Sequence, residues 1–313
     1  MLYLTYNINT NQDGLAAQYQ RIVGIICIAK HYNIQYVHTE IKYMEHIENC
    51  NPKDKTTDLS KCIYLDKIKD YFGFANNFDS VDKYNYDEII EESNPTNDII
   101  QKYMNSAKNI LMKIYLPYNI CESDVSIYTK TIPLLRTMIK PVPLKFYNPN
   151  NFNIAVHVRR GDVSPINNSE RYTSTEQIIE IINNLKKLYP NGIIYIFTEI
   201  TEENKNEFDL LLNDNIKLKA NEDILDTFNH LMKADVLILG KSSFSYLAGL
   251  YNPNIVYNLE FWHKSMPNWI NVNNINSIEG FENNNKINNF YSFNDIILLL
   301  LFAILLYLIL FKL

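Results

Sequence analysis

The chain has 313 residues and a mass of 36.7 kDa, which is enough for two domains with full hydrophobic cores. Its formal net charge is -6 and its pI is about 5.6, with no basic stripe, which argues against a general nucleic-acid-binding protein. The four cysteines form no CxxC pair, so we expect neither a disulfide framework nor a zinc site. A bridge between Cys50 and Cys62 is left open.

The amino-terminal part begins with the pattern of a βαβ unit and then becomes less regular. In chain order the pattern predicts a strand at Leu2–Tyr6, a helix at Leu15–Tyr32, a strand at Ile34–His38, and a helical region at Asp87–Tyr118 in one or two pieces broken at Pro95. Residues 42–86 show no clear period. The proline-rich segment Pro141–Asn151 is expected to be an interdomain linker.

From Asn153 onward, short apolar runs alternate with amphipathic segments of about ten residues. The predicted strands are Ile154–Val158, Ile193–Thr198, Ile216–Leu218, Val236–Leu239 and Ile255–Asn258, and the predicted helices are Thr175–Leu188, Glu202–Leu212, Ile224–Lys233 and Phe244–Tyr251. This alternation predicts a parallel sheet wound by right-handed crossovers. The soluble part is therefore expected to be α/β, with two Rossmann-like domains at 1–150 and 151–270 that face a cleft.

The carboxyl-terminal end has a different composition from the rest of the chain. Residues 271–292 are rich in Asn, with few apolar residues to bury, and are expected to be a linker. Residues 293–313 contain the uninterrupted apolar run Ile296–Phe311, which shows no polar face and predicts a single-pass transmembrane tail anchor. Because almost nothing follows the run, we expect the catalytic part to lie on the cytosolic side of the membrane.

The apolar run Ile154–Val158 ends in two arginines, Arg159 and Arg160, followed by Gly161 and Asp162. In an open α/β sheet, the carboxyl ends of the strands face the crevice where ligands bind. Two permanently charged guanidiniums at such a strand end point to an anion, with phosphate as the leading candidate. The alternative is an arginine pair held by surface carboxylates.

A second polar stretch, Gly240–Ser245, follows the strand predicted at Val236–Leu239 and opens a helix. Ser242 and Ser243 at the helix amino terminus suit a phosphate, although a plain N-cap has the same appearance. The sequence contains neither GxxxxGK[ST] nor GxGxxG, which argues against a P-loop nucleotidase and a dinucleotide site. It also lacks a DxD pair, so we expect a diphosphate site that uses guanidinium charge, without a metal or another cofactor.

The segment His157–Asp162 resembles the His-x-Arg-Arg-Gly-Asp signature of the α1,2- and α1,6-fucosyltransferase superfamily, which includes the nodulation fucosyltransferases and, more distantly, the protein O-fucosyltransferases. Gly14–Arg21 is similar to the amino-terminal glycine-rich turn and helix of that superfamily, and Ile224–Tyr246 resembles its later block. The order and approximate spacing fit, with little similarity between the segments. The resemblance implies a metal-independent GT-B fold that uses GDP-fucose and inverts the anomeric centre.

The resemblance also implies roles for individual residues. Arg159 matches the arginine that binds the donor β-phosphate, His157 a histidine that positions the nucleotide, and Asp162 the acid that holds the arginines. Asp226 matches the acid that reads the guanine edge, while Ser242 and Ser243 match the phosphate-binding hydroxyls. Glu199 follows a strand where the family has paired acids, and it is the candidate base for the acceptor hydroxyl. The full expected set is Arg159, Asp162 and Glu199 for catalysis, and His157, Arg159, Arg160, Asp226, Ser242, Ser243 and Phe244 for donor binding.

Two details of the motifs refine these expectations. Alternation along the strand favours Arg159 as the arginine that faces the phosphate and turns Arg160 toward the protein. Ala16 and Ala17 occupy positions where the family often has glycine or asparagine, so the acceptor side is not specified by the sequence.

The leading hypothesis is a membrane-tethered fucosyltransferase that transfers fucose from GDP-fucose to a hydroxyl of a glycan or glycoprotein. One alternative is a related transferase that uses another nucleotide sugar. Another is an inactive relative that binds a nucleotide or a glycan at a membrane. None of the three has a nucleic-acid partner.

Overall fold

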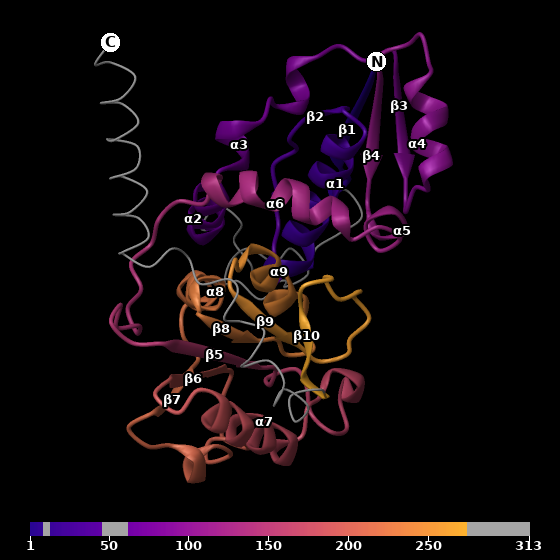
Figure 1. The fold of residues 1–313 in the computed structure, drawn as a ribbon. Helices are drawn as coiled ribbons and strands as arrows, with labels where there is room; N and C mark the ends of the chain where they lie inside the picture. The colour runs from indigo at the N-terminus through magenta and orange to yellow at the C-terminus, as the bar shows by residue number, and fades with distance from the viewer. Residues whose placement is uncertain (9–12, 46–61, 274–313) are drawn as a thin grey trace, which may run out of the picture. The chain divides into compact units, whose positions relative to one another are not determined.

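The structure is a computed structural model that describes residues 1–8, 13–45 and 62–273 of the chain. Residues Met1–Val272 form one compact unit that contains two parallel β-sheets, each flanked by helices (Figure 1). The predicted α/β class is therefore confirmed. Below, the residues up to Met138 are called the amino-terminal half and those from Asn153 the carboxyl-terminal half.

The amino-terminal half carries a four-stranded sheet with the order β2-β1-β4-β3, in which every pairing is parallel. Its main elements are β1 (Leu2–Tyr6), α1 (Leu15–His31), β2 (Gln35–Tyr36), α2 (Ile63–Phe72), α3 (Phe74–Asn77), β3 (Glu88–Glu92), α4 (Asn97–Met104), β4 (Ile110–Ile114), α5 (Tyr118–Cys121) and α6 (Ser126–Met138). Helix α1 is apolar on nearly every side and is buried from Leu15 to Ala29 except at Ala17. It contacts α5, α6 and a helix of the carboxyl-terminal half, α9 (Ser243–Tyr251), so one hydrophobic core runs through both halves.

The carboxyl-terminal half carries a six-stranded sheet with the order β10-β9-β8-β5-β6-β7, again parallel throughout. Besides α9, its main elements are β5 (Asn153–Val158), α7 (Thr175–Leu188), β6 (Ile193–Thr198), β7 (Ile216–Ala220), α8 (Ile224–Lys233), β8 (Val236–Ile238), β9 (Ile255–Asn258) and β10 (Ile270–Asn271). Renumbered from one, this is the 3-2-1-4-5-6 order of the Rossmann fold. The chain starts at β5, winds outward to β7, and returns to β8 on the other side of β5. The switch point between β5 and β8 is where ligands bind in such sheets.

Of two predicted helical regions, one is helical only in part and the other is not helical. The region Asp87–Tyr118 contains strands β3 and β4 around the short helix α4. β4 is buried and reads as a short apolar run without alternation, which cannot be told from a helix segment by its period alone. At Glu202–Leu212 the chain forms turns and a single 3₁₀ turn at Asp209–Leu211, because Leu210 and Leu212 are exposed and supply no buried helical face.

Several expectations concern the remaining segments of the chain. The predicted linker Pro141–Asn151 contains neither helix nor strand. Cys27 and Cys121 are free and buried, while Cys50 lies outside the described residues. Among the described residues, no helix is both long and apolar enough to cross a bilayer. The predicted tail anchor Ile296–Phe311, and all but the first three residues of the predicted linker 271–292, lie outside the described residues.

Candidate functional site

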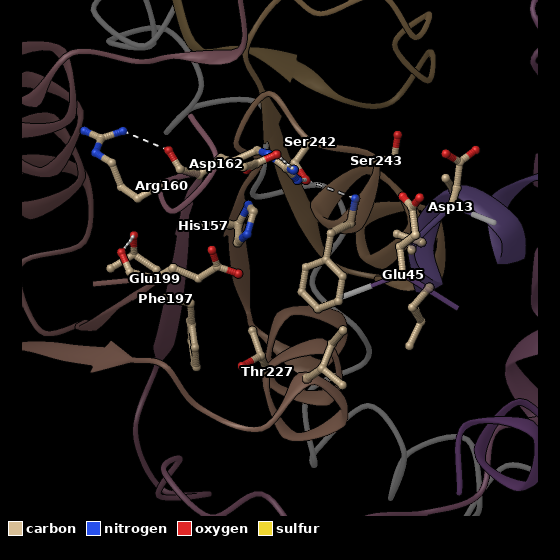
Figure 2. A pocket seen from close by; sticks show the side chains of 18 of the residues that line it. Asp13, Glu45, His157, Arg160, Asp162, Phe197, Glu199, Thr227, Ser242 and Ser243 are labelled. Carbon is tan, nitrogen blue, oxygen red and sulfur yellow. Dashed lines mark hydrogen bonds and ion pairs between the residues drawn. The ribbon is translucent and has the colours of Figure 1, made fainter. Parts of the chain in front are cut away.

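A large cavity of about 1240 Å³ opens at the carboxyl ends of β5, β6 and β8 and is lined by residues of both halves. From the carboxyl-terminal half it is lined by His157, Arg159, Asp162, Glu199, Ser242, Ser243 and Phe244, among others. The amino-terminal half contributes Asp13, Arg21, Tyr64 and Tyr118, among others. Figure 2 shows Asp13 and Glu45 on one side of this cavity and His157, Asp162 and Glu199 on the other. The structure therefore brings together all but one of the residues that the sequence indicated, and the exception is Asp226.

Arg159 lies at the centre of the polar wall of the cavity. One terminal nitrogen, Nη1, donates to Oγ of Ser242 at 3.0 Å, and the other, Nη2, pairs with the Asp162 carboxylate at 2.7 Å. The guanidinium is thus held at both ends by residues that follow two adjacent strands, β5 and β8. The part of the side chain that stays exposed, 24%, faces the cavity. A fixed cation of this kind is suited to an anionic ligand.

The amino terminus of α9 forms the neighbouring part of the wall. Ser242 is its N-cap, and the buried Oγ accepts the N–H of Phe244 at 3.2 Å as well as the bond from Arg159. The positive end of the helix dipole and the free N–H groups of the first turn favour negative charge at this position. Ser243, the first residue of the helix, lines the cavity with a partly exposed side chain. Arg159 and α9 therefore offer positive charge to the same region.

His157 is a neutral component of this wall. Burial, followed by the nearby Arg159 guanidinium, lowers the pKa of the His157 imidazole to about 3 from an ordinary value of 6.5. Its ring lies against Gly240, where an added Cβ would come within 2.7 Å of the His157 carbonyl oxygen and 2.8 Å of Nδ1. Only glycine at position 240 permits this approach between the ends of β5 and β8. At neutral pH, His157 supplies shape and a hydrogen-bonding nitrogen, and the positive charge belongs to Arg159.

Arg160 also lines the cavity, but its guanidinium is held by the protein itself. The residue is 4% exposed, and its guanidinium pairs with the Glu207 carboxylate, donates to the Thr173 and Arg159 carbonyls, and stacks over the Tyr172 ring at 4.5 Å. The hydrogen-bond donors of Arg160 named above are therefore all bonded to other groups of the protein. These contacts are those of a structural residue, in line with the alternation along the strand. Arg160 fixes the loop that follows β5, and Arg159 keeps an exposed face toward the cavity.

Gly161 and Glu199 are packed against each other beside the arginine turn. Gly161 has φ +77°, a conformation that side chains other than glycine rarely adopt. A Cβ at this position would also lie 1.8 Å from Oε2 of Glu199. The Glu199 carboxylate therefore lies directly against the turn that carries Arg159 and Asp162. It is in the cavity, as predicted, but on the side of the expected phosphate.

The acid expected to read the nucleobase, Asp226, does not line the cavity. It is 6% exposed, and its carboxylate pairs with Lys145 from the segment that joins the two halves. Asp223, one helical turn earlier, lies in the cavity instead. Its Oδ1 caps α8 by accepting the N–H groups of Leu225 and Asp226, and its Oδ2 accepts the Tyr64 hydroxyl at 2.5 Å.

Two further cavity residues are held by carboxylates of the amino-terminal half, and the sequence did not indicate these pairings. His263 is bonded through Nδ1 to the carboxylate of Glu122 at 2.9 Å, and Arg21 pairs with Asp13 at 2.7 Å. The partners in the first pair are 141 positions apart, so no spacing could have indicated it. Among the described residues, no cluster of three or more His, Cys, Asp or Glu side chains could bind a metal ion.

Comparisons with known proteins identify no family for this chain. Neither a protein-family model nor a curated protein matches the sequence. Among solved structures, the chain is similar to POFUT1 in complex with GDP-fucose, with 10% identity over 83% of this chain and 98% of that chain and a TM-score of 0.49. It is also similar to the E. coli heptosyltransferase WaaC with ADP-2-deoxy-2-fluoro heptose, with 10% identity over 91% of this chain and 100% of that chain and a TM-score of 0.42. The glycosyl transferase family 9 protein from Veillonella parvula DSM 2008 matches with 10% identity over 86% of this chain and 83% of that chain and a TM-score of 0.43. Because every TM-score is below 0.5, a function for this chain has to be argued from its own residues.

Proposed function

We propose that the chain is a metal-independent, inverting glycosyltransferase of the GT-B type that binds a nucleotide-diphosphate sugar in the cavity. The observation that carries the proposal is the Arg159 guanidinium, bonded to Asp162 and Ser242 at the switch point of a Rossmann sheet. The resemblance of His157–Asp162 to the fucosyltransferase signature makes GDP-fucose the leading donor. The cavity of about 1240 Å³ exceeds the size of ordinary ligand pockets and has room for an acceptor as well. The proposed acceptor is a hydroxyl of a glycan or glycoprotein.

The arrangement of charges suits departure of a nucleoside diphosphate. When the bond between the sugar and the β-phosphate breaks, negative charge develops on the phosphate oxygens. Arg159 and the amino terminus of α9 face that charge and are already fixed, so they need little reorganisation during the reaction. Each good donor of this kind contributes about 3–4 kcal/mol to the lowering of the barrier. Because the positive charge comes from a guanidinium and a helix terminus, a bridging metal is not required by the proposed step.

The nucleobase is proposed to lie near the start of α8. Asp223 and Asn221 line the cavity there, beside the ends of β6 and β7. A carboxylate accepts paired N–H donors, which the Watson–Crick edge of guanine provides. Asp223 therefore replaces Asp226 as the candidate for guanine recognition, and Tyr64 is the group that the base would displace from it.

Attachment to a membrane is part of the same proposal. As a helix the apolar run Ile296–Phe311 spans roughly 24 Å, and Phe293 and Lys312 extend its reach toward the ~30 Å of a hydrocarbon core, so it would hold the catalytic unit at a cytosolic membrane surface. Expression of the full chain and of residues 1–292 with cell fractionation tests this. We expect alkaline carbonate to leave the full chain in the membrane pellet and residues 1–292 in the supernatant. Release of the full chain by carbonate would contradict the anchor and leave the transferase proposal intact.

The donor is tested by calorimetric titration of the full chain with GDP, GDP-fucose and UDP in the presence of EDTA. We expect GDP and GDP-fucose to bind and UDP to bind more weakly, with slow release of GDP from GDP-fucose. Absence of GDP binding overturns the fucosyltransferase assignment. Preferential binding of UDP would support a transferase with another donor, and tight GDP binding with no turnover toward any glycan would support an inactive relative.

A further inference from the structure

A second polar constellation in the cavity is not used by the donor site described above. His263 lies in the segment between β9 and β10, and its side chain is only 2% exposed. Its Nδ1 lies 2.9 Å from Oε1 of Glu122, which directly follows α5 in the amino-terminal half. Nε2 of the same imidazole lies 3.1 Å from the amide nitrogen Nε2 of Gln20 in α1. His263 is therefore a residue of the donor-binding half that is held by two side chains of the opposite half.

The hydrogen bonds of His263 fix which of its nitrogens carries the proton. The indole N–H of Trp262 donates to Nε2 at 3.1 Å, and an indole nitrogen can only donate. Nε2 must therefore present its lone pair, and Nδ1 must carry the hydrogen that is donated to Glu122. This is the tautomer of a histidine base whose second nitrogen is oriented by a carboxylate.

The lone pair of His263 lies beside the proposed phosphate site. Nε2 is 3.4 Å from Oγ of Ser243, and Ser243 follows Ser242, which bonds to Arg159. His263, Ser243 and Trp262 line the same cavity, and Figure 2 shows Ser243 on the side of Ser242 that faces Asp13 of the amino-terminal half. His263 therefore lines the cavity between the proposed phosphate site and the amino-terminal half, where the acceptor is expected to bind.

We propose that His263 is the base that accepts the proton of the acceptor hydroxyl, with Glu122 as its positioning residue. This inference rests on the proposed function. As the acceptor oxygen bonds to the anomeric carbon, its proton passes to Nε2 of His263. The bond between that carbon and the β-phosphate oxygen breaks with its electron pair on the phosphate, opposite Arg159. The Glu122 carboxylate stabilises the imidazolium that forms, and His263 later returns the proton to water.

Glu199 is the rival for this role, and the geometry favours His263. The Glu199 carboxylate is packed against Gly161, in the turn that carries Arg159, so it lies with the leaving phosphate. In an inverting reaction the acceptor attacks from the face of the sugar opposite the leaving group, and His263 is held by Glu122 and Gln20 of the amino-terminal half, where the acceptor is expected. His263 is supported from the amino-terminal half and already has the correct tautomer, and the acceptor hydroxyl would take the place of the Trp262 and Gln20 N–H groups at Nε2.

The test uses the full chain, GDP-fucose as donor and water as acceptor, and follows GDP release. We expect His263→Ala to reduce the rate by about 100-fold or more, in the range of general base catalysis, with GDP affinity unchanged. Added imidazole is expected to restore much of the lost rate, since it can enter the space left by the side chain. A purely structural histidine would give no such rescue. Glu122→Gln, which keeps an oxygen that accepts from Nδ1 but removes the charge, is expected to cause a smaller loss of rate without loss of GDP binding.

Glu199→Gln is the matched comparison, because it makes the same chemical change at the rival carboxylate. A large loss in Glu199→Gln with none in Glu122→Gln would overturn the inference, as would wild-type turnover in His263→Ala. If His263→Ala fails to fold, the Glu122→Gln and Glu199→Gln pair decides between the two candidates. If the wild-type chain binds no GDP, the proposed function is overturned and this inference with it. If it binds GDP but His263→Ala and Glu122→Gln keep wild-type turnover, only the inference is overturned.

Discussion

Arg159 and Ser242 are 83 positions apart in the sequence, yet Nη1 of the arginine donates to the serine Oγ at 3.0 Å. The contact joins the ends of β5 and β8, which are parallel neighbours in the sheet although α7, β6, β7 and α8 lie between them in the chain. The order of the strands reverses at this pair, so the contact marks the crevice of a Rossmann sheet. A guanidinium held in that crevice by two side chains is the basis for the predictions that follow.

Arg159→Ala is expected to reduce the rate of GDP release from GDP-fucose by about 10²–10³-fold, since one preorganised donor contributes about 3–4 kcal/mol to the barrier. Arg159→Lys should recover only part of the loss, because an ammonium cannot contact Asp162 and Ser242 through two separate nitrogens. Steady-state kinetics with GDP-fucose, together with a thermal unfolding curve of each variant, provide the measurement. Near-wild-type turnover in a folded Arg159→Ala protein would remove Arg159 from the site.

Gly161→Ala should damage both the site and the stability of the fold. The backbone there has φ +77°, which costs other residues about 1–2 kcal/mol, and the new methyl would collide with the Glu199 carboxylate. We expect a lower unfolding free energy and weaker GDP binding, because the displaced turn carries Arg159.

Gly73→Ala is the matched control for this substitution. Gly73 also has a positive φ, +67°, and a Cβ there would meet the Met138 carbonyl at 2.6 Å, but the residue does not line the cavity. The Gly73→Ala protein should have a lower unfolding free energy in urea and an unchanged GDP affinity in calorimetry. Equal losses of GDP affinity in the two variants would mean that the Gly161 effect is not local to the site.

The sequence was sufficient for the donor wall because that wall is made of local signals. The apolar run Ile154–Val158 followed by Arg159 predicts a buried strand with a charged end, and Ser242 predicts the start of a helix. The fold class and both strand ends could therefore be predicted. Where a position depended on the phase of a helix, the sequence did not indicate which side chain lines the cavity. Asp223 and Asp226 lie on the same helix start, and only the contact of Asp226 with Lys145 reveals which one points away from the cavity.

Long-range pairs left no trace in the sequence. Glu122 and His263 are brought together by the packing of two halves, and neither residue has a local motif that marks it. The strand β10 has only two residues and forms because β9 offers a free edge, which no short-range pattern can indicate. Strand β4 was predicted to be part of a helical region because it is buried on both faces. Such a strand lacks the alternation of polar and apolar residues that identifies a strand with one exposed face.

Asp223→Asn is expected to weaken GDP binding by roughly 10–100-fold, because a hydrogen bond to a charged group contributes about 1.5–3 kcal/mol. Asparagine is an equally good N-cap, so α8 should remain intact and the change reports on the carboxylate alone. Asp226→Asn makes the same substitution one turn later and should lower the unfolding free energy, through the lost pairing with Lys145, without changing GDP affinity. Calorimetry on the two variants compares them directly, and the opposite result would return the base-reading role to Asp226.

His157→Gln is expected to change the dependence of stability on pH. The pKa of His157 is about 3 in the folded protein and about 6.5 when the chain is unfolded, because burial and then Arg159 oppose its charge. Between pH 6.5 and pH 3 the unfolded chain binds a proton at His157 that the folded chain does not bind. This proton favours the unfolded state, so the folded protein becomes less stable as pH falls below about 6.5. The loss approaches about 1.4 kcal/mol per pH unit for a single site. His38, whose pKa is lowered to about 4 by burial, acts in the same direction but is present in both proteins and cancels in the comparison.

Urea midpoints measured from pH 7.5 to pH 4 should therefore converge, with the wild type losing stability faster than His157→Gln. Parallel curves would show that His157 is readily protonated in the folded chain and that the cavity wall is not as dry as the burial of Nδ1 indicates.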